Sequence, residues 1–484
     1  MTFFSGGDID FSKLYLWNLD QEKKEQTGFH MPGHNRGAFF GNEYKKRILS
    51  LDTTELSCSE DLHHPGARLS LLMEKTARLQ KSGASFFLTT GSTTGIHAMI
   101  GAVLSKKSFF LLPRNVHMSV LSVFSMLHCR YEFISFENGS GEPLSPKALE
   151  AALKKYPQAT DVFLVSPDYF GRVAEVEALS SVCHKNGCRL LVDEAHGAHF
   201  SFACDIFPKS AMSSGADISV QSIHKTMPAF TMTALLHIGR EALSENRVSK
   251  DRVCMALSLF ETSSPSLLLA ASSEYAIAWM EKNAKETYGN MKPFLEDFVE
   301  QIEAIMGTQS LMRMSHEKKD FSRLVLDTKK WNIPAFLIHR ELEKRGIFPE
   351  FSDFSRLVFI LSPWQKKEDF AALLSALLDI SKNLRNGRGE SEPFEDLWEN
   401  AFSLLPIREK TLYAATFEEE TSYFCRLKDA EGKVATKAII PYPPGIPLIW
   451  PGEVVQRAHI LFLQKMIHHG LTVLGMKDGN ICVF

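Results

Sequence analysis

The sequence predicts an α/β fold in which a large, mostly parallel sheet forms the main domain. Between about residues 84 and 236, short apolar runs of strand length recur, and helix-like segments lie between several of them. Such runs are typical of parallel strands that helices cover on both faces, and ligands of doubly wound domains bind at the carboxyl ends of the strands. The expected strands lie at 86–88, 109–112, 133–136, 162–165, 190–192 and 218–220.

One segment shows the alternating helices most clearly. In 174–187, the residues Val176, Leu179 and Val182 recur at helical spacing, and Gly187 marks the end. A helix between two apolar strands is the unit from which a parallel sheet is built.

After residue 262 the pattern changes to long amphipathic helices and then to a smaller α+β unit. Segment 383–396, rich in Gly, Asn and charge, predicts a linker. We therefore expect an N-terminal segment (1–62), a large domain (63–265), a small α+β domain (266–385) and a C-terminal α+β domain (386–484). The later elements are expected as helices at 266–284, 291–307 and 333–346 and strands at 323–327 and 356–361.

Composition and charge exclude several classes of partner. The 54 basic and 57 acidic residues give a net charge of −3, so no bulk field recruits nucleic acid or an anionic membrane. The eight cysteines include no C-x-x-C pair, which is typical of reduced thiols in a cytosol. With no signal-peptide pattern and no run of about 18 apolar residues, we expect a cytoplasmic protein without a membrane span.

The segment TTGSTTGIHAM follows an expected strand and opens a helix. Gly91 permits a tight turn, and Ser92 and Thr93 bring hydroxyls and free N–H groups to the helix N-terminus. These features suit a phosphate group. A simple helix cap by Ser or Thr explains the same residues equally well.

The segment LLVDEAHGAH places Asp193 and Glu194 at the end of a buried strand. Its letters also match the DEAH box of a helicase. A helicase needs a G-x-x-x-x-G-K-[ST] loop for its nucleotide, which the sequence lacks, and the net charge offers no nucleic-acid track. We therefore reject the helicase interpretation.

Lys225 follows another expected strand end, directly after Ser222 and His224 in QSIHKT. A lone lysine in this place is usually solvated. Here the lysine, the acid Asp193 and the TTGSTTG turn all lie at one rim of the sheet. This combination favours pyridoxal 5′-phosphate (PLP), with a Schiff-base lysine, a carboxylate on the pyridine nitrogen and helix N–H groups on the phosphate.

Eight motifs in order make the sequence similar to the ornithine/lysine/arginine decarboxylases, whose fold is that of aspartate aminotransferase. They are FHMPGHNRG, TTELSCSEDLHHPGA, TTGSTTGI, PRNVHMS, SPDYFGR, LLVDEAHGAH, QSIHKT and PYPPGIPLIWPGE. The resemblance is to the short form, without the added N-terminal wing domain. It implies a PLP-dependent transferase fold and an active site built at a homodimer interface, or within a higher homo-oligomer.

The resemblance also implies site residues. Lys225 would form the Schiff base, Asp193 would pair with the pyridinium nitrogen, His117 would stack over the ring, and His196 would lie beside it. A structural role as a hydrogen-bonded histidine is almost as well supported for His196. For His199 a structural role is the main expectation. The residues implied for the phosphate are Ser92, Thr93, Ser222 and His224.

A basic substrate carries a distal cation, which needs carboxylates or aromatic faces. In KRGIFPEF, Glu350 matches the family glutamate expected to face that cation. Tyr442 and Glu453 are further candidates, although the Pro-rich segment around them also reads as a rigid loop with a solvated glutamate. Thr262 and Ser263 would pass near the cofactor or the partner subunit. The loop FHMPGHNRG would reach an active site, that of its own subunit or the neighbour's.

The sequence departs from the family pattern at several positions. Met118 follows His117 where a lysine is usual, and Asp168 stands where a threonine is common. The stretch TMPAFTMTALLHI lacks a Gln-Ser pairing found in many members. These changes leave the cofactor site intact and leave the substrate and the activity open.

No metal site is expected. His30 and His34 flank a Pro-Gly turn, so they do not share a helical face, and the adjacent His63 and His64 do not suit one tetrahedral ion.

The resemblance implies PLP-dependent decarboxylation of arginine, lysine or ornithine to the amine and CO₂, for polyamine metabolism. Arginine has a slight edge because short enzymes of the family often serve polyamine synthesis. The proton donor to Cα remains open between His196 and Lys225. Alternatives are an aminotransferase, in which Arg323 or Arg356 would hold the α-carboxylate, an aldolase, and a catalytically silent PLP-binding homologue.

Overall fold

The computed structural model describes residues 27–35, 37–135, 143–306, 318–331, 333–385, 401–402, 404, 406–417, 421–442 and 445–484. Its centre is a seven-stranded sheet in the order β2-β8-β7-β6-β5-β3-β4. Every strand runs parallel to the others except β8, which is antiparallel to both neighbours. The strands are β2 (Ala84–Leu88), β3 (Phe110–Leu112), β4 (Tyr131–Phe133), β5 (Asp161–Val165), β6 (Arg189–Asp193), β7 (Ile218–Ser222) and β8 (Ala234–Ile238).

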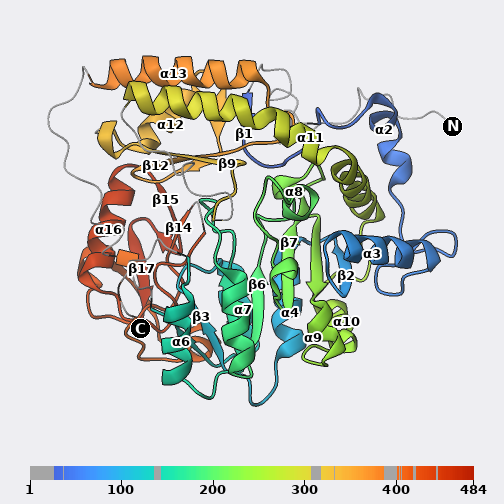
Figure 1. Ribbon diagram of the computed structural model, residues 1–484. Helices are drawn as coiled ribbons and strands as arrows, with labels where there is room; N and C mark the ends of the chain where they lie inside the picture. Colours follow the sequence, from blue (N-terminus) through green and yellow to red (C-terminus); the bar gives the residue numbers. More distant parts are fainter. Residues whose placement is uncertain are drawn as a thin grey trace, which may run out of the picture.

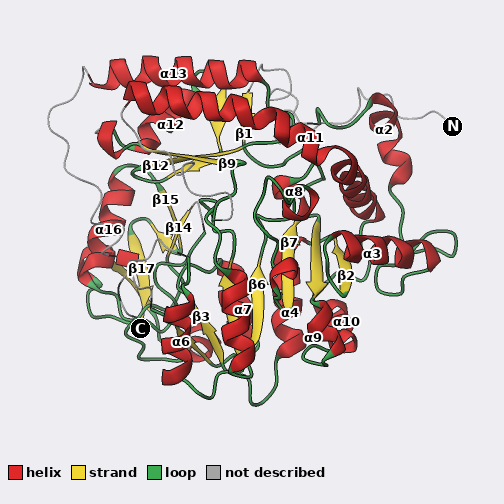
Figure 2. Cartoon of the chain, viewed as in Figure 1, coloured by secondary structure: helices red, strands yellow, loops and turns green. Residues whose placement is uncertain are grey.

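Five of the six expected apolar runs lie in this sheet, because helices bury it on both faces, whereas the run expected at 133–136 overlaps β4 only at Phe133. Two consecutive residues of β6, Leu190 and Leu191, point to opposite faces of the sheet and belong to two different hydrophobic clusters. A continuous apolar run is therefore needed, and the sequence carries one. The flanking helices are α4 (Gly91–Val103), α5 (Met118–Met126), α6 (Pro146–Lys155), α7 (Val176–Lys185), α9 (Arg240–Ser244) and α10 (Lys250–Phe260) (Figures 1 and 2).

The smaller α+β unit lies above the carboxyl ends of these strands in Figure 1. Its antiparallel sheet has the order β11-β12-β9, and α11 and α13 run side by side over it. The two helices expected at 266–284 and 291–307 are instead one 40-residue helix, α11, which continues through Pro293. The elements are α11 (Leu267–Met306), β9 (Arg323–Asp327), α12 (Ala335–Glu343), β11 (Phe351–Ser352), β12 (Arg356–Ile360) and α13 (Lys367–Arg385).

The N-terminal segment joins this unit through backbone pairing. Strand β1 (Thr27–Phe29) pairs in parallel with β10 (Ile347–Pro349), with Phe29 opposite Pro349. The residues that follow each strand, His30 and Glu350, are thereby brought to the same end of this small sheet. The short helices α2 (Asn42–Arg47) and α3 (Ala67–Leu79) then lead back to the large sheet.

The C-terminal elements lie on the β3 side of the large sheet in Figure 1, and Arg408 binds Glu132 of the edge strand β4. They form two small sheets, ordered β13-β17-β16 and β14-β15. Most of the linker expected at 383–396 lies outside the described residues, and the fourfold division of the chain stays a prediction. The elements are α15 (Leu412–Phe417), β13 (Tyr423–Arg426), β14 (Ile440–Tyr442), α16 (Arg457–His468), β15 (Thr472–Leu474), β16 (Met476–Lys477) and β17 (Asn480–Val483). No helix in the described ranges is long and apolar enough to cross a membrane.

Candidate active site

A cavity of about 380 Å³ opens where the parallel strands β5, β6 and β7 end. Its size is that of a small-molecule site. The structure brings together in its lining Ser92, Thr93, His117, Asp193, His196, His224, Lys225 and Tyr442, all of them expected from the sequence. Further lining residues that the sequence did not single out for the site include Met31, Asn115, Tyr169, Arg172, Thr231 and Phe402.

Lys225 and Asp193 lie on adjacent strand ends. Asp193 is the last residue of β6, and Lys225 follows β7 in the short helix α8 (Ile223–Thr226). Burial raises the pKa of Asp193 and lowers the pKa of Lys225, while the attraction between the two groups opposes both shifts. The backbone N–H of Ala195 donates to Asp193 Oδ1 at 3.0 Å and so helps to hold the carboxylate. The site thus presents a buried carboxylate beside a lysine whose pKa burial lowers.

The N-terminus of α4 forms another wall of the cavity. Gly91 has a φ of +85°, which glycine adopts without strain. Thr90 is the N-cap residue, yet its side chain makes no capping hydrogen bond and binds Glu261 Oε2 at 2.7 Å instead. The simple-cap interpretation of this turn therefore does not hold for Thr90. The Ser222 hydroxyl donates to Ser92 Oγ at 2.8 Å, so Ser222 supports the turn from behind.

His117 lines the cavity as the N-cap of α5. Its Nδ1 accepts from the backbone N–H of Ser119 at 3.2 Å, and its pKa is lowered to about 4 by burial and by the charge of Lys225. The imidazole is therefore neutral at pH 7. A Cβ on Gly445 would lie 3.5 Å from His117 Nε2, so the C-terminal loop passes close to the ring.

His196 lies between two basic side chains, Lys225 and Arg323. Its Nε2 is 3.3 Å from Lys225 Nζ, and its Nδ1 is 2.8 Å from Arg323 Nη2. Burial first, and then the charges of Lys225 and Arg323, hold the pKa of His196 well below its ordinary value. The Tyr169 ring packs edge-on against the imidazole, with centroids 4.8 Å apart. The two expected roles of His196, beside the ring and as a hydrogen-bonded residue, are both compatible with this position.

The Asp168 departure has a structural basis. Its carboxylate accepts from the backbone N–H groups of Phe170 and Arg172, each at 2.9 Å, and from Arg172 Nε at 2.7 Å. Asp168 thereby fixes the turn after β5 and neutralises a cavity-lining arginine. Met118, the other departure, is the first residue of α5, and its N–H donates to Gly445 O at 3.2 Å.

Glu350 is not among the residues that line the cavity, but it contacts two residues that do, Met31 and Tyr169. Its Oε2 accepts from the Met31 N–H at 3.0 Å, and its Oε1 accepts from the Tyr169 hydroxyl at 3.3 Å. The Gly33 N–H donates to His224 O at 2.9 Å. The loop FHMPGHNRG therefore packs on the lysine segment of its own chain.

Glu453 does not reach the cavity, which corrects its expected place at the substrate. It is 1% exposed and forms an ion pair with Arg114 at 2.5 Å, and it also accepts from the Trp450 N–H at 2.8 Å. Nor is it the solvated glutamate of the alternative interpretation. Tyr442, by contrast, lines the cavity and is 49% exposed.

Several other candidates lie outside the cavity lining. His199 is fully buried, and its Nε2 is 3.2 Å from Asp320 Oδ1, in agreement with a structural role. The Thr262 backbone carbonyl contacts His63 Nε2 at 2.8 Å, and Ser263 follows on the same exposed turn. Among the described residues, no group of three or more His, Cys, Asp or Glu side chains is placed to hold a metal ion.

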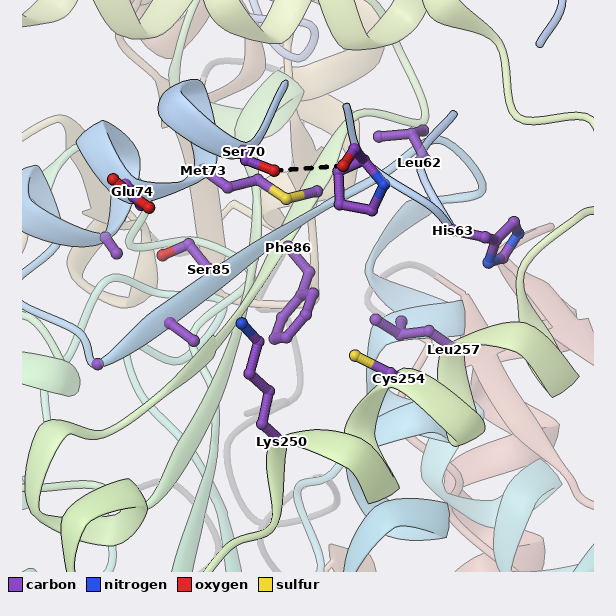
Figure 3. A pocket seen from close by; sticks show the side chains of 14 residues that line it. Leu62, His63, Ser70, Met73, Glu74, Ser85, Phe86, Lys250, Cys254 and Leu257 are labelled. Atoms are coloured by element: carbon purple, nitrogen blue, oxygen red, sulfur yellow. Dashed lines mark hydrogen bonds between the residues drawn. The ribbon is translucent and has the colours of Figure 1, made fainter. Parts of the chain in front are cut away.

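A second cavity, of about 360 Å³, lies at the edge strand β2 (Figure 3). Figure 3 shows Phe86 and Leu257 at this cavity, with Lys250 and Cys254 of α10 beside them. Its walls are mainly apolar, and it includes none of the residues expected at the active site. The chemistry therefore points to the first cavity.

Comparisons with known proteins agree with this geometry. The family model described as "Orn/Lys/Arg decarboxylase, major domain" matches residues 14–315, and the corresponding C-terminal domain model matches 398–475. The chain is 30% identical to a Bacillus subtilis protein named "Uncharacterized protein YaaO" (97% of this chain, 98% of that one). It is 29% identical to an arginine decarboxylase of the same organism (97% and 96%).

A solved structure of similar fold is the lysine decarboxylase LdcF of Francisella novicida. It superposes with a TM-score of 0.76 at 18% identity, over 96% of this chain and 79% of that one. The likeness confirms the fold class expected from the sequence.

Proposed function

The chain belongs to the Orn/Lys/Arg decarboxylase family and is a decarboxylase of a basic amino acid, and we propose that it acts on arginine with PLP held in the cavity described above. The observation that carries the proposal is the placement of Lys225 beside Asp193, opposite the N-terminus of α4. The product would be the amine for polyamine metabolism, formed in the cytoplasm, in line with the absence of a C-x-x-C pair.

The residues present fit PLP. The first turn of α4 offers N–H groups that the Thr90 side chain does not cap, and this suits a phosphate. Asp193 is buried, so its carboxylate suits a partner with a protonated ring nitrogen. When bound, PLP supplies a carbonyl that condenses with amines and a conjugated ring that accepts the electron pair of a broken bond.

The chain's own groups prepare this chemistry. Lys225 provides a nucleophilic amine because burial disfavours its ammonium form. Neutral His117 forms a flat wall that adds no positive charge beside Lys225. With Ser92, Thr93 and His224 at the phosphate end, the remaining wall is left for the substrate.

The substrate end is suited to a cation because its arginines are neutralised. Arg172 pairs with Asp168 at 2.6 Å, and Arg356 pairs with Asp353 at 2.6 Å. The Glu350 carboxylate carries the charge expected to face the guanidinium of arginine, with Tyr442 as an aromatic neighbour. The B. subtilis arginine decarboxylase is 29% identical to this chain and the E. coli inducible lysine decarboxylase 22%, which favours arginine over lysine.

The aminotransferase alternative requires an arginine able to chelate the α-carboxylate. Arg323 is absent from the cavity lining, and the guanidinium of Arg356 is paired with Asp353 and stacked on Phe170 at 3.8 Å. Both observations favour decarboxylation.

The direct test incubates the purified holoenzyme with arginine, lysine and ornithine separately and measures CO₂ and the amine. We expect the highest kcat/KM with arginine and no activity for Lys225→Ala. Higher kcat/KM with lysine or ornithine would reassign the substrate. Transfer of the amino group to a keto acid without CO₂ release would overturn the proposal.

We also propose that the enzyme is a homodimer or a higher homo-oligomer. Large apolar side chains are exposed on two helices that also contribute residues to the second cavity: Leu71 of α3 is 64% exposed and Leu259 of α10 is 72% exposed. Exposed apolar groups of this size favour a protein interface. Light scattering should give at least twice the mass of the chain, and Leu259→Glu should lower it; a monomeric wild type would contradict the proposal.

A further inference from the structure

Arg323 is a buried cation with an unusual partner. It begins β9, its side chain is 0% exposed, and its guanidinium Nη2 lies 2.8 Å from His196 Nδ1. Gly171 makes room for it: a Cβ there would lie 2.6 Å from Arg323 Cβ. The arginine stem thus passes between the turn after β5 and the small sheet to reach a histidine at the cavity.

The pairing determines which nitrogen of His196 carries the proton. A guanidinium has only donors, so Nδ1 must accept, and neutral His196 carries its proton on Nε2. That proton points toward Lys225 Nζ, 3.3 Å away. An ammonium has no lone pair to accept it, so the contact is a hydrogen bond only when Lys225 is an unprotonated amine.

Arg323 forms no ion pair with a carboxylate among the described residues, although its charge helps to lower the pKa of buried Asp320. Its Nε and Nη1 have no hydrogen-bond partner among the described residues. Buried guanidinium groups that serve stability are normally paired with carboxylates, and leaving donors unpaired in the interior costs free energy. Burying Arg323 with two unpaired donors costs free energy, and the arginine contacts a histidine that lines the cavity. We therefore infer that Arg323 has a role in the active site.

We propose that Arg323 is a positioning residue that holds neutral His196 with its proton on Nε2, where it is donated to the lone pair of an unprotonated Lys225. The inference rests on the proposed function only in taking Lys225 as the amine that bonds the cofactor. Because the free amine is the nucleophilic form, the pairing keeps Lys225 ready to bond the cofactor carbonyl.

Several charged or titratable groups act on Lys225 together with Arg323, and any test must hold them constant. They come from β6 and the loop after it, from α5, from α8 and from the β10–β11 junction: Asp193, His196, His117, His224 and Glu350.

The first test measures the protonation of Lys225 in the full-length protein freed of cofactor. Limiting formaldehyde with borohydride labels unprotonated amines, and peptide mass spectrometry reports Lys225 separately. Arg323→Met should move the labelling midpoint of Lys225 upward by about one pH unit, because a cation is lost and His196 can turn a lone pair toward the ammonium. Arg189→Met, which removes an arginine paired with Asp161 far from Lys225, should leave the midpoint unchanged. A folded Arg323→Met protein with an unmoved midpoint would overturn the proposal.

The second test uses wild-type protein and therefore does not depend on whether an Arg323 variant folds. In wild-type protein with ¹⁵N-labelled histidine rings, the signals of His196 are those that His196→Asn removes. We expect the chemical shift of an unprotonated Nδ1 and a protonated Nε2; the reverse pattern would refute the assignment. Neither readout uses decarboxylation, so a protein that released no CO₂ would disprove the proposed function while leaving the tautomer measurable.

Discussion

The carboxylate of Glu350 accepts a hydrogen bond from the backbone N–H of Met31, with Oε2 and N 3.0 Å apart. The two residues are 319 positions apart in the chain, and the parallel pairing of β1 with β10 brings them together. Because Met31 lines the cavity, this contact holds the carboxylate of Glu350 next to the wall of the candidate active site. It is the structural reason to test Glu350 first.

Replacing Glu350 with Gln should weaken substrate binding without unfolding the loop. The amide oxygen can still accept from the Met31 N–H, but the charge that faces the guanidinium is lost. A charge-assisted hydrogen bond contributes roughly 1.5–3 kcal/mol, which corresponds to a rise of about 10- to 100-fold in KM for arginine. Steady-state kinetics measure this rise, and the visible absorbance of bound PLP should not change.

The matched control is Glu343→Gln, which removes a half-exposed carboxylate whose partner is His339. Its KM should equal that of the wild type. An unchanged KM in Glu350→Gln would remove Glu350 from the substrate site.

Replacing Glu453 with Gln should reduce stability and leave KM unchanged. The substitution leaves the guanidinium of Arg114 buried without its counter-charge, and breaking a buried pair from one side costs about 3–5 kcal/mol. Thermal unfolding monitored by circular dichroism should show a clearly lower midpoint. Glu177→Gln, in an exposed pair with Lys209, should leave the midpoint close to that of the wild type. A rise in KM with unchanged stability would restore Glu453 to the substrate site.

The residues predicted correctly at the cavity are those whose position follows from local sequence. Asp193 and Lys225 end buried apolar strands, and parallel neighbours carry such residues to one edge. Arg323 was considered only as a carboxylate ligand, because its contact with His196 joins residues 127 apart and depends on how the small sheet packs. Glu453 was misplaced for the same reason, since its partner Arg114 is 339 residues away.

For the fold, too, features that depend on neighbouring residues could be predicted, whereas features that depend on distant contacts could not. The strand expected at 190–192 lies within β6. It could be predicted because a strand that is buried on both faces must consist of consecutive apolar residues. Strand β8 has an equally apolar run, ALLHI, and nothing in that run distinguishes an antiparallel strand from a parallel one. The helices expected on either side of residue 290 join into α11 because burial of residues such as Leu295 outweighs the hydrogen bond that Pro293 removes.

Lys319 should make stability depend on pH in a predictable direction. Its amine is 3% exposed without a hydrogen-bond partner in the described structure, and burial lowers its pKa to about 7 from 10.5. Below pH 7 the folded protein buries the charge at full cost, and above about pH 10.5 both states are neutral. The folded state therefore gains stability as the pH rises between these values, by an amount on the order of 5 kcal/mol at most.

Removing the amine should remove this pH dependence. Lys319→Met should raise the unfolding midpoint most at pH 6, and the difference from the wild type should shrink toward pH 10. The lost attraction to Asp320 reduces the gain without reversing its trend with pH. A difference that grows with rising pH would contradict the assigned shift.

Alanine substitutions at Gly171 and Gly187 should distinguish the loss of stability caused by backbone strain from the loss caused by a steric clash. Both have positive φ, +81° and +72°, so alanine is strained at either position. A Cβ at Gly187 meets nothing within 4 Å, whereas at Gly171 it would lie 2.6 Å from Arg323 Cβ. Gly187→Ala should lower stability by about 1 kcal/mol, and Gly171→Ala should lower it by several kcal/mol because the buried arginine cannot move aside. Thermal unfolding of the two variants measures the difference. Equal midpoints would mean that Arg323 yields to the methyl group, and that its contact with His196 is not held by the packing around it.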